Sequence, residues 1–291
     1  MEAKSQRNLI NRIFVGCLIS ALGFALVNLL GDRIFSLKIA QIPLWQSILW
    51  SYLTGLLLII VFIPVLLKSR WRGFTLFIGI WLPLYYIAYL SGGLIESYFF
   101  TTVPRSELWL ISLNGMVATI VLTYLMIVVF AGKEKGTATK EKRALPAKRA
   151  WYAWVWRIAL CAFIYLFLYF LAGGIFYQYF TKPLYTDPSL SLMPPESGAD
   201  FFKWLVPLQL VRGALFALVL LPLCRSLKIR RAYLALLIGL ILYIVGGFAP
   251  LIAPNPWLPD KLRFYHAIEI FFQNFPTGLA IAYILGAKKQ S

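Results

Sequence analysis

The sequence is poor in charge and in the residues that most active sites use. Charged residues make up 13% of its 291 positions, and His266 is the one histidine. Soluble domains carry roughly a quarter charged residues and disordered chains are less apolar still, so both classes are excluded. Cys17, Cys161 and Cys224 are dispersed and form no Cys-x-x-Cys pair. This spacing argues against a thiol-based metal or redox centre, and we expect no metal and no cofactor.

The standard nucleotide-binding and hydrolase motifs are absent as well. The chain has no GxxxxGK[ST], GxGxxG, HExxH or GxSxG pattern. Nucleotide-driven chemistry and the common hydrolase mechanisms therefore have no support, because each needs one of these arrangements of glycine, nucleophile or metal ligand. Whether the chain is an enzyme at all stays open at this stage.

Apolar residues, in contrast, make up 60% of the chain and fall into long runs. About 20 apolar residues are needed to cross the hydrocarbon core as a helix. Eight runs have this length: 12–31, 46–67, 74–94, 108–131, 153–175, 201–224, 232–253 and 264–286. The first run follows basic residues as a signal peptide would, but its full length favours a retained helix. The sequence thus predicts an all-α, polytopic membrane helix bundle with eight transmembrane helices.

The net charge of +17 indicates topology before it indicates a partner. Of the 28 basic residues, 19 fall in the N-terminal arm, the even-numbered loops and the C-terminal tail, and Arg157 lies just inside the fifth span at the same end. The positive-inside rule places these segments, and with them both termini, in the cytoplasm, and an even number of spans agrees. We expect a bacterial inner membrane protein whose basic loops contact anionic lipids, with no nucleic acid partner. The oligomeric state is open.

The spans contain two patterns of internal similarity. Gly55 and Pro64 in the second span have the same spacing as Gly213 and Pro222 in the sixth, and a basic turn follows each pair. This pattern favours a parallel 4+4 duplication, with halves at 1–131 and 151–291 joined by a basic cytoplasmic linker at 132–150. Eight helices in a 4+4 plan resemble haem A synthase in architecture, but that chemistry requires several histidines and this chain has one.

A second pattern supports a different repeat. An aromatic-x-x-Gly-Gly sequence begins at Tyr89, Phe170 and Tyr243, in the third, fifth and seventh spans. This spacing favours a repeating two-helix hairpin. Chance similarity is a third explanation, because glycine and aromatic residues are common in membrane helices.

Two ionisable side chains lie inside the predicted spans, where charge is costly and points to function. Arg212 lies about 16 Å from the outer end of the sixth span, and Glu269 lies about 8 Å from the outer end of the eighth. Side chains lean toward a helix N-terminus, so we expect Arg212 to point toward the level of Glu269 and to pair with it.

Helical spacing puts further polar residues beside these two. Arg263, His266, Glu269, Gln273 and Thr277 form one stripe on the eighth span, bordered by Asn274, and Gln209 precedes Arg212 by one turn. The predicted site therefore consists of Arg212, His266, Glu269, Arg263, Gln209, Gln273 and Asn274. A polar stripe of this kind also occurs as an interhelical seam with no ligand.

Three functions fit these features. The first is a small-molecule or ion transporter, or a ligand-binding membrane protein, with an outward-facing polar site at Arg212, His266 and Glu269. The second is an intramembrane enzyme acting on a lipid-linked or phosphorylated substrate at the outer leaflet, with His266 and Glu269 as acid and base. The third is an accessory subunit of a membrane complex with no site of its own.

Overall fold

The computed structural model describes residues 2–37, 42–100, 105–130, 150–185, 199–227, 229–254 and 258–286. Over these ranges the chain is helical apart from short turns and isolated β-bridge residues, which include the pair Ser69 and Leu227. Eight stretches are long and apolar enough to cross a membrane: Ile13–Ile34, Leu44–Lys68, Gly73–Ile95, Arg105–Phe130, Trp151–Tyr185, Phe202–Ser226, Arg231–Ile252 and Asp260–Leu285. Each matches one predicted span, so the prediction of eight helices that are long and apolar enough to span a membrane is confirmed.

The helices are numbered in chain order. They are α1 (Glu2–Ile34), α2 (Leu44–Lys68), α3 (Gly73–Tyr85), η2 (Tyr86–Glu96), α4 (Ser97–Phe100), α5 (Arg105–Phe130), α6 (Trp151–Phe176), η3 (Tyr177–Thr181), α7 (Lys182–Tyr185), α8 (Ala199–Ser226), α9 (Arg231–Tyr243), η5 (Ile244–Phe248), α10 (Ala249–Ile252) and α11 (Asp260–Leu285). The predicted basic linker at 132–150 lies outside the described residues except for Ala150, and so do 186–198 and 255–257.

Proline marks several boundaries and also lies inside helices. Pro43 and Pro259 immediately precede α2 and α11, where a fixed φ and a missing N–H cost nothing. Other prolines interrupt the spans: Pro64, Pro83, Pro207, Pro222 and Pro276. Membrane helices accommodate such residues because neighbouring helices and polar side chains satisfy the freed backbone groups.

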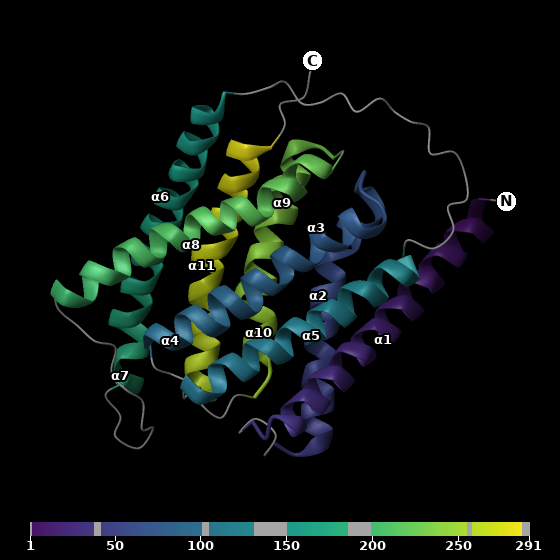
Figure 1. Cartoon of the computed structure of the whole chain (residues 1–291), viewed down its shortest axis with the longest axis horizontal. Helices are drawn as coiled ribbons and strands as arrows, with labels where there is room; N and C mark the ends of the chain where they lie inside the picture. Colours follow the sequence, from purple (N-terminus) through teal and green to yellow (C-terminus); the bar gives the residue numbers. More distant parts are fainter. Residues whose placement is uncertain are drawn as a thin grey trace.

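The two predicted halves pack in corresponding ways (Figure 1). In the first half α1 packs on α2 and α5, and α5 packs on α3. In the second half α6 packs on α8 and α11, and α11 packs on α9. Contacts between the halves correspond too, since α3 meets α8 while α9 meets α2. By its neighbours, α1 therefore corresponds to α6, α2 to α8, α3 to α9 and α5 to α11.

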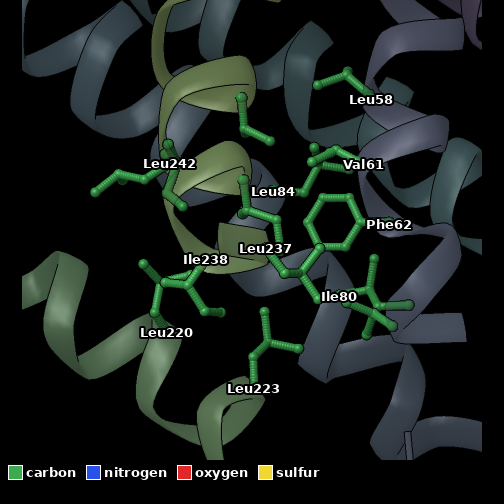
Figure 2. Packing of buried hydrophobic residues seen from close by; sticks show 14 of the residues in the cluster. Leu58, Val61, Phe62, Ile80, Leu84, Leu220, Leu223, Leu237, Ile238 and Leu242 are labelled. Atoms are coloured by element: carbon green, nitrogen blue, oxygen red, sulfur yellow. The ribbon is translucent and has the colours of Figure 1, made fainter. Parts of the chain in front are cut away.

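An apolar core joins the halves at the centre of the bundle (Figure 2). The core takes side chains from all eight spans. Those that Figure 2 labels come from α2, α3, α8 and α9: Leu58, Val61, Phe62, Ile80, Leu84, Leu220, Leu223, Leu237, Ile238 and Leu242. Close helix approach in each half depends on a glycine. A Cβ on Gly55 would lie 3.1 Å from the Cα of Ala21, and one on Gly213 would lie 2.9 Å from the Cα of Ala162. Gly55 and Gly213 are the pair that the 4+4 alignment equates.

One end of the bundle collects basic residues, and we call it the basic end. The turns after α2 and α8 pair there through a β-bridge between Ser69 and Leu227, and the Arg70 N–H donates to the Ser226 carbonyl at 3.2 Å. The Arg225 guanidinium lies 5.1 Å from the ring centre of Trp154 at the start of α6. These contacts place the turns after α2 and α8 and the start of α6 at one end of the bundle. This grouping is expected when consecutive spans alternate in direction. The α7 helix lies at the opposite end (Figure 1).

The aromatic-x-x-Gly-Gly sequences coincide with a change of helix type. Two of the three Gly-Gly pairs lie within π-helical turns, η2 and η5, and the third pair, Gly173 and Gly174, ends shortly before η3. π-helical turns are rare in proteins overall, and those that occur are frequently found at functional sites. The η2 and η5 turns face each other across the two halves, where a Cβ on Gly92 would lie 3.8 Å from the Gly246 carbonyl oxygen.

Candidate functional site

Three polar side chains of α11 and one of α7 form a hydrogen-bonded row, which we call the α11 row. It consists of Tyr185 from α7 and of His266, Glu269 and Gln273 from α11. The Tyr185 hydroxyl lies 3.2 Å from Nε2 of His266, and Nδ1 of His266 lies 2.9 Å from Oε2 of Glu269. Gln273 Nε2 donates to Oε1 of Glu269 at 2.9 Å. The row thus connects a hydroxyl at the end opposite the basic end to an amide four residues deeper than Glu269.

Exposure decreases along the α11 row toward the interior. The side chain of His266 is 26% exposed and that of Glu269 is 13% exposed, while Gln273 is buried. Space for the carboxylate comes from Gly173 in α6, where a Cβ would lie 3.3 Å from Oε1 of Glu269. Since both ring nitrogens of His266 have partners, a proton arriving on one side can be matched by release on the other.

A second group lies between the halves and is more deeply buried. This inter-half cluster consists of Ser91 from η2, Tyr165 from α6, and Gln209 and Arg212 from α8. Arg212 Nε donates to the Ser91 hydroxyl at 3.1 Å, and Arg212 Nη1 donates to Gln209 Oε1 at 2.8 Å. The Tyr165 hydroxyl donates to the same oxygen at 3.3 Å. Arg212 is 4% exposed, so its charge is removed from solvent.

Aromatic rings help to stabilise the Arg212 guanidinium. Its central carbon lies 5.8 Å from the ring centre of Tyr165 and 6.0 Å from that of Phe216. A cation over an aromatic face gains electrostatic attraction that is larger when water is excluded. The α8 spacing places Gln209, Arg212 and Phe216 on one face, because residues three and four apart are neighbours on a helix.

The predicted pair between Arg212 and Glu269 is not among the contacts of the described residues. Arg212 contacts α6 at Tyr165, whereas Glu269 contacts it at Gly173. Eight residues of helix separate these positions, which is a rise of about 12 Å. The placement of α8 and α11 against α6 therefore puts Arg212 and Glu269 in different clusters.

Other members of the predicted site bind the backbone. Arg263 donates to the carbonyls of Leu251 and Ala253, where α10 ends, and its Nη2 lies 2.6 Å from Oδ1 of Asp260. Asn274 Nδ2 donates to the Leu242 carbonyl at 3.2 Å. Leu242 lies two residues before the start of η5, and a shift from α to π hydrogen bonding leaves one carbonyl without a helical partner. These contacts favour structural roles for Arg263 and Asn274.

Sequence reasoning missed a polar cluster in the first half. Asn114 Nδ2 donates to Oδ1 of Asp32 at 3.0 Å and to the Asn28 carbonyl at 3.2 Å. Asp32 lies one residue beyond the predicted first span, 12–31, but α1 continues to Ile34 and carries Asp32 as a helical residue. The available signal was Asn114 itself, an amide ten residues into a span, because polar side chains inside a span need partners.

Two cavities beside α6 are apolar. One, of about 450 Å³, lies along α6 and is lined by Phe163, Leu166, Phe167, Phe170 and Leu171. The other, of about 290 Å³, lies between α6 and α8 and is lined by Ala159, Ala162, Phe163, Leu210, Val211 and Ala214. Neither of these two cavities is lined by a residue of the predicted site.

The described residues also hold no group of three or more His, Cys, Asp or Glu side chains that could bind a metal ion. The side chains of the two polar clusters are suited to proton exchange in the α11 row, and to hydrogen bonding with positive charge in the inter-half cluster. Compared with known proteins, the chain matches no family model, no curated protein and no solved structure.

Proposed function

We propose that the chain is a proton-linked transporter of a small polar solute. In this proposal the α11 row exchanges protons with the outer side, and the inter-half cluster contacts the solute. The single observation that carries it is the row from Tyr185 through His266 and Glu269 to Gln273, which leads from partly exposed groups into the span. Ionisable groups arranged in this way inside membrane helices are the usual components of proton relays.

The arrangement of the halves supports alternating access. We propose that residues 1–131 and 151–291 are parallel repeats, because corresponding helices have corresponding neighbours. Thr54 and Arg212, which the alignment equates, both reach across to the other half: Thr54 Oγ1 donates to the Ala249 carbonyl, and Arg212 donates to Ser91. Sites at the interface of two repeats can be opened by rocking one repeat against the other.

The orientation follows from charge. We propose that the basic end faces the cytoplasm of a bacterial inner membrane and that both termini lie there. The α11 row then opens to the outer side, where the proton concentration is higher in an energised cell.

Proton flux in proteoliposomes tests the transport proposal. Purified protein is reconstituted with a pH-sensitive dye inside, and the potential is clamped with potassium and valinomycin. Chloride, nitrate, phosphate, glycine and glutamate are then added separately outside. We expect at least one solute to cause internal acidification. The Glu269→Gln variant should lose this response, and Glu107→Gln, which removes a carboxylate in the first turn of α5, should keep it.

A cysteine-labelling measurement makes the test independent of the solute's identity. Ser91→Cys places a thiol in the inter-half cluster, and its labelling by a small thiol reagent is followed between pH 5 and pH 8. We expect labelling to change with pH, and Glu269→Gln to abolish that change. The proposal is wrong if no solute moves protons and the labelling rate is the same at every pH.

One observation favours an enzyme as the second candidate. His266 binds a hydroxyl, Tyr185, through one ring nitrogen and a carboxylate, Glu269, through the other. This is the geometry of a nucleophile, a general base and an orienting carboxylate. The test is release of inorganic phosphate from a polyprenyl diphosphate in mixed micelles. Release that His266→Gln abolishes would select the enzyme over the transporter.

A further inference from the structure

We propose that the groove between α6 and α8 binds one anionic phospholipid, with an acyl chain in the groove and the phosphate at Arg225 near the basic end. The inference goes beyond the proposed function, because it concerns a lipid on the outside of the bundle and requires neither transport nor catalysis. It also narrows the general attraction between basic loops and anionic lipids to one place on one pair of helices.

The α6 helix belongs to the least covered of the eight described spans. In the most apolar stretch of Trp151–Tyr185, 22% of the residues are buried inside the protein, against 33–50% in the other seven spans. Phe163 and Phe167 of α6 are 57% and 65% exposed. Because side chains exposed at this depth face hydrocarbon, this span offers lipid a larger share of its surface than the others do.

Small residues give this surface a groove. The cavity of about 290 Å³ between α6 and α8 has three alanines in its lining, Ala159, Ala162 and Ala214, and larger apolar side chains border them. The adjoining cavity of about 450 Å³ shares Phe163 and continues along α6. A polar ligand would lose its hydrogen bonds against such a lining, whereas a hydrocarbon chain loses none. The groove therefore fits an acyl chain.

Helical spacing connects the groove with the basic end. At 100° per residue, four residues of α8 fall within about 60° of one another: Val211, Ala214, Leu218 and Arg225. Leu218, between the groove and Arg225, is 44% exposed. The rise from Ala214 to Arg225 is about 16 Å, which is half of the ~30 Å hydrocarbon core. A chain that begins beside Arg225 and follows this face therefore ends in the groove.

The start of α6 indicates the level of the lipid headgroups. Tyr152 and Trp156 are 66% and 63% exposed, and helical spacing places them on the same face as Phe163. Tyrosine and tryptophan are enriched where membrane meets water, because their rings are apolar and their tips are polar. The groove begins at Ala159, about 4–10 Å deeper than these two residues, which is the depth of acyl chains.

Arg225 provides the positive charge for a phosphate. Its guanidinium lies 5.1 Å from the ring centre of Trp154, and it forms no ion pair with the acidic side chains that the structure describes. Those acidic side chains lie at or toward the opposite ends of their helices: Asp32, Glu107, Asp260 and Glu269. A guanidinium presents its N–H donors in a fork that matches phosphate oxygens. An anionic headgroup is therefore favoured over a zwitterionic one.

Lipid-dependent stability tests the inference. The melting temperature of the protein in dodecyl maltoside is measured with increasing phosphatidylglycerol, with phosphatidylcholine of the same acyl chains, or with glycerol phosphate. We expect phosphatidylglycerol to raise it saturably and phosphatidylcholine to raise it less. Glycerol phosphate, which has no acyl chain, should leave it unchanged. A lipid at ten times its Kd increases the folding equilibrium constant about elevenfold.

Matched variants make the result specific. Ala214→Trp fills the groove and should abolish the response, while Ile60→Trp in α2, the counterpart of α8, should keep it because Ile60 is 54% exposed and lines neither cavity. Arg225→Gln should reduce the response to phosphatidylglycerol to that of phosphatidylcholine. Arg70→Gln removes the same charge from the exposed turn after α2 and should keep the difference between the two lipids.

Equal melting temperatures of the wild-type protein in the two lipids would overturn the inference, and so would a response that either Ala214→Trp or Arg225→Gln leaves unchanged. A wild-type protein with the mass of a dimer in detergent, which Ala214→Trp converts to a monomer, would assign the groove to a second copy of the chain and overturn it as well. The wild-type comparison decides the matter even if a variant fails to fold. Glu269→Gln should lose proton flux and keep the lipid response, so failure of the transport proposal and failure of lipid binding are distinguishable.

Discussion

Polar side chains within the spans differ in what they bind. Asn274 and Arg263 bind carbonyls at or near helix interruptions, so they complete the backbone. Glu269 and Arg212 bind other side chains, whose protonation or position can change. The distinction separates residues needed for folding from residues that can carry chemistry, and it leads to different expectations for their variants.

Arg263→Ala is expected to destabilise the protein. The substitution removes the donor that satisfies two carbonyls at the end of α10, and hydrogen bonds to charged groups contribute about 1.5–3 kcal/mol each. We expect the melting temperature of the solubilised protein to fall by roughly 5 °C. Asp260→Asn is the matched control, because the Asp260 side chain is 93% exposed and exposed ion pairs contribute little. Equal losses in the two variants would contradict the structural role of Arg263.

Among individual residues, the sequence predicted which polar side chains share one face of a helix, but it did not predict which residues of other helices they contact. Helical spacing correctly placed His266, Glu269 and Gln273 in one stripe, because they share a helix. The expected partner of Arg212 lies on a different helix, and spacing along one chain segment carries no information about how two helices are displaced against a third. Ser91, which accepts a hydrogen bond from Arg212, was missed for the same reason.

At the scale of elements, glycines set the distances between helices. Gly278 in α11 faces α9 so closely that an added Cβ would lie 2.6 Å from the Ile238 carbonyl oxygen and 2.6 Å from the Cα of Gly239. Both atoms belong to backbone, which cannot rotate away. The pair α9–α11 therefore depends on the absence of a side chain at this position.

Gly278→Ala is expected to push α9 and α11 apart and to destabilise the protein by about 1–3 kcal/mol, the usual cost of overpacking. Thermal unfolding followed by circular dichroism measures the loss. Gly174→Ala in α6 is the matched control, since its Cβ would meet no atom within 4 Å. A Gly278→Ala variant as stable as the control would show that the two helices tolerate greater separation.

The aromatic-x-x-Gly-Gly sequences lie in or near the π-helical turns, although the sequence did not predict a change of helix type. The aromatic-x-x-Gly-Gly sequences of the third and seventh spans lie in or at η2 and η5, and that of the fifth span ends shortly before η3. A period of 3.6 residues was assumed throughout each span, so the change of hydrogen bonding was not predictable from apolar periodicity. Glycine pairs were the visible signal, and their meaning required the backbone.

For the whole molecule, the number of spans was predictable and the sidedness stays a prediction. Span number depends on apolar length alone, which is a local property. The arrangement of two four-helix halves required the contacts between helices, because glycine and proline spacing in the second and sixth spans is compatible with more than one repeat.

Labelling in intact cells checks the sidedness. The native cysteines are buried and give a low background to a membrane-impermeant maleimide. Ser36, between α1 and α2, and Ala150, before α6, are exposed and lie at opposite ends of the bundle. We expect Ser36→Cys to react in intact cells and Ala150→Cys to react only after permeabilisation. The reverse result would place the basic end outside and would contradict the positive-inside assignment.

The β-bridge between Ser69 and Leu227 limits how the halves can move. It joins the two halves through backbone atoms at the basic end, while the α11 row lies at the other end. Two groups of helices that are joined at the basic end can separate without breaking that connection only at the opposite end. Opening at the end that holds the α11 row therefore leaves the bridge intact, whereas opening at the basic end must break it. The bridge makes the two directions energetically unequal, and the end opposite the basic end is the easier one to open.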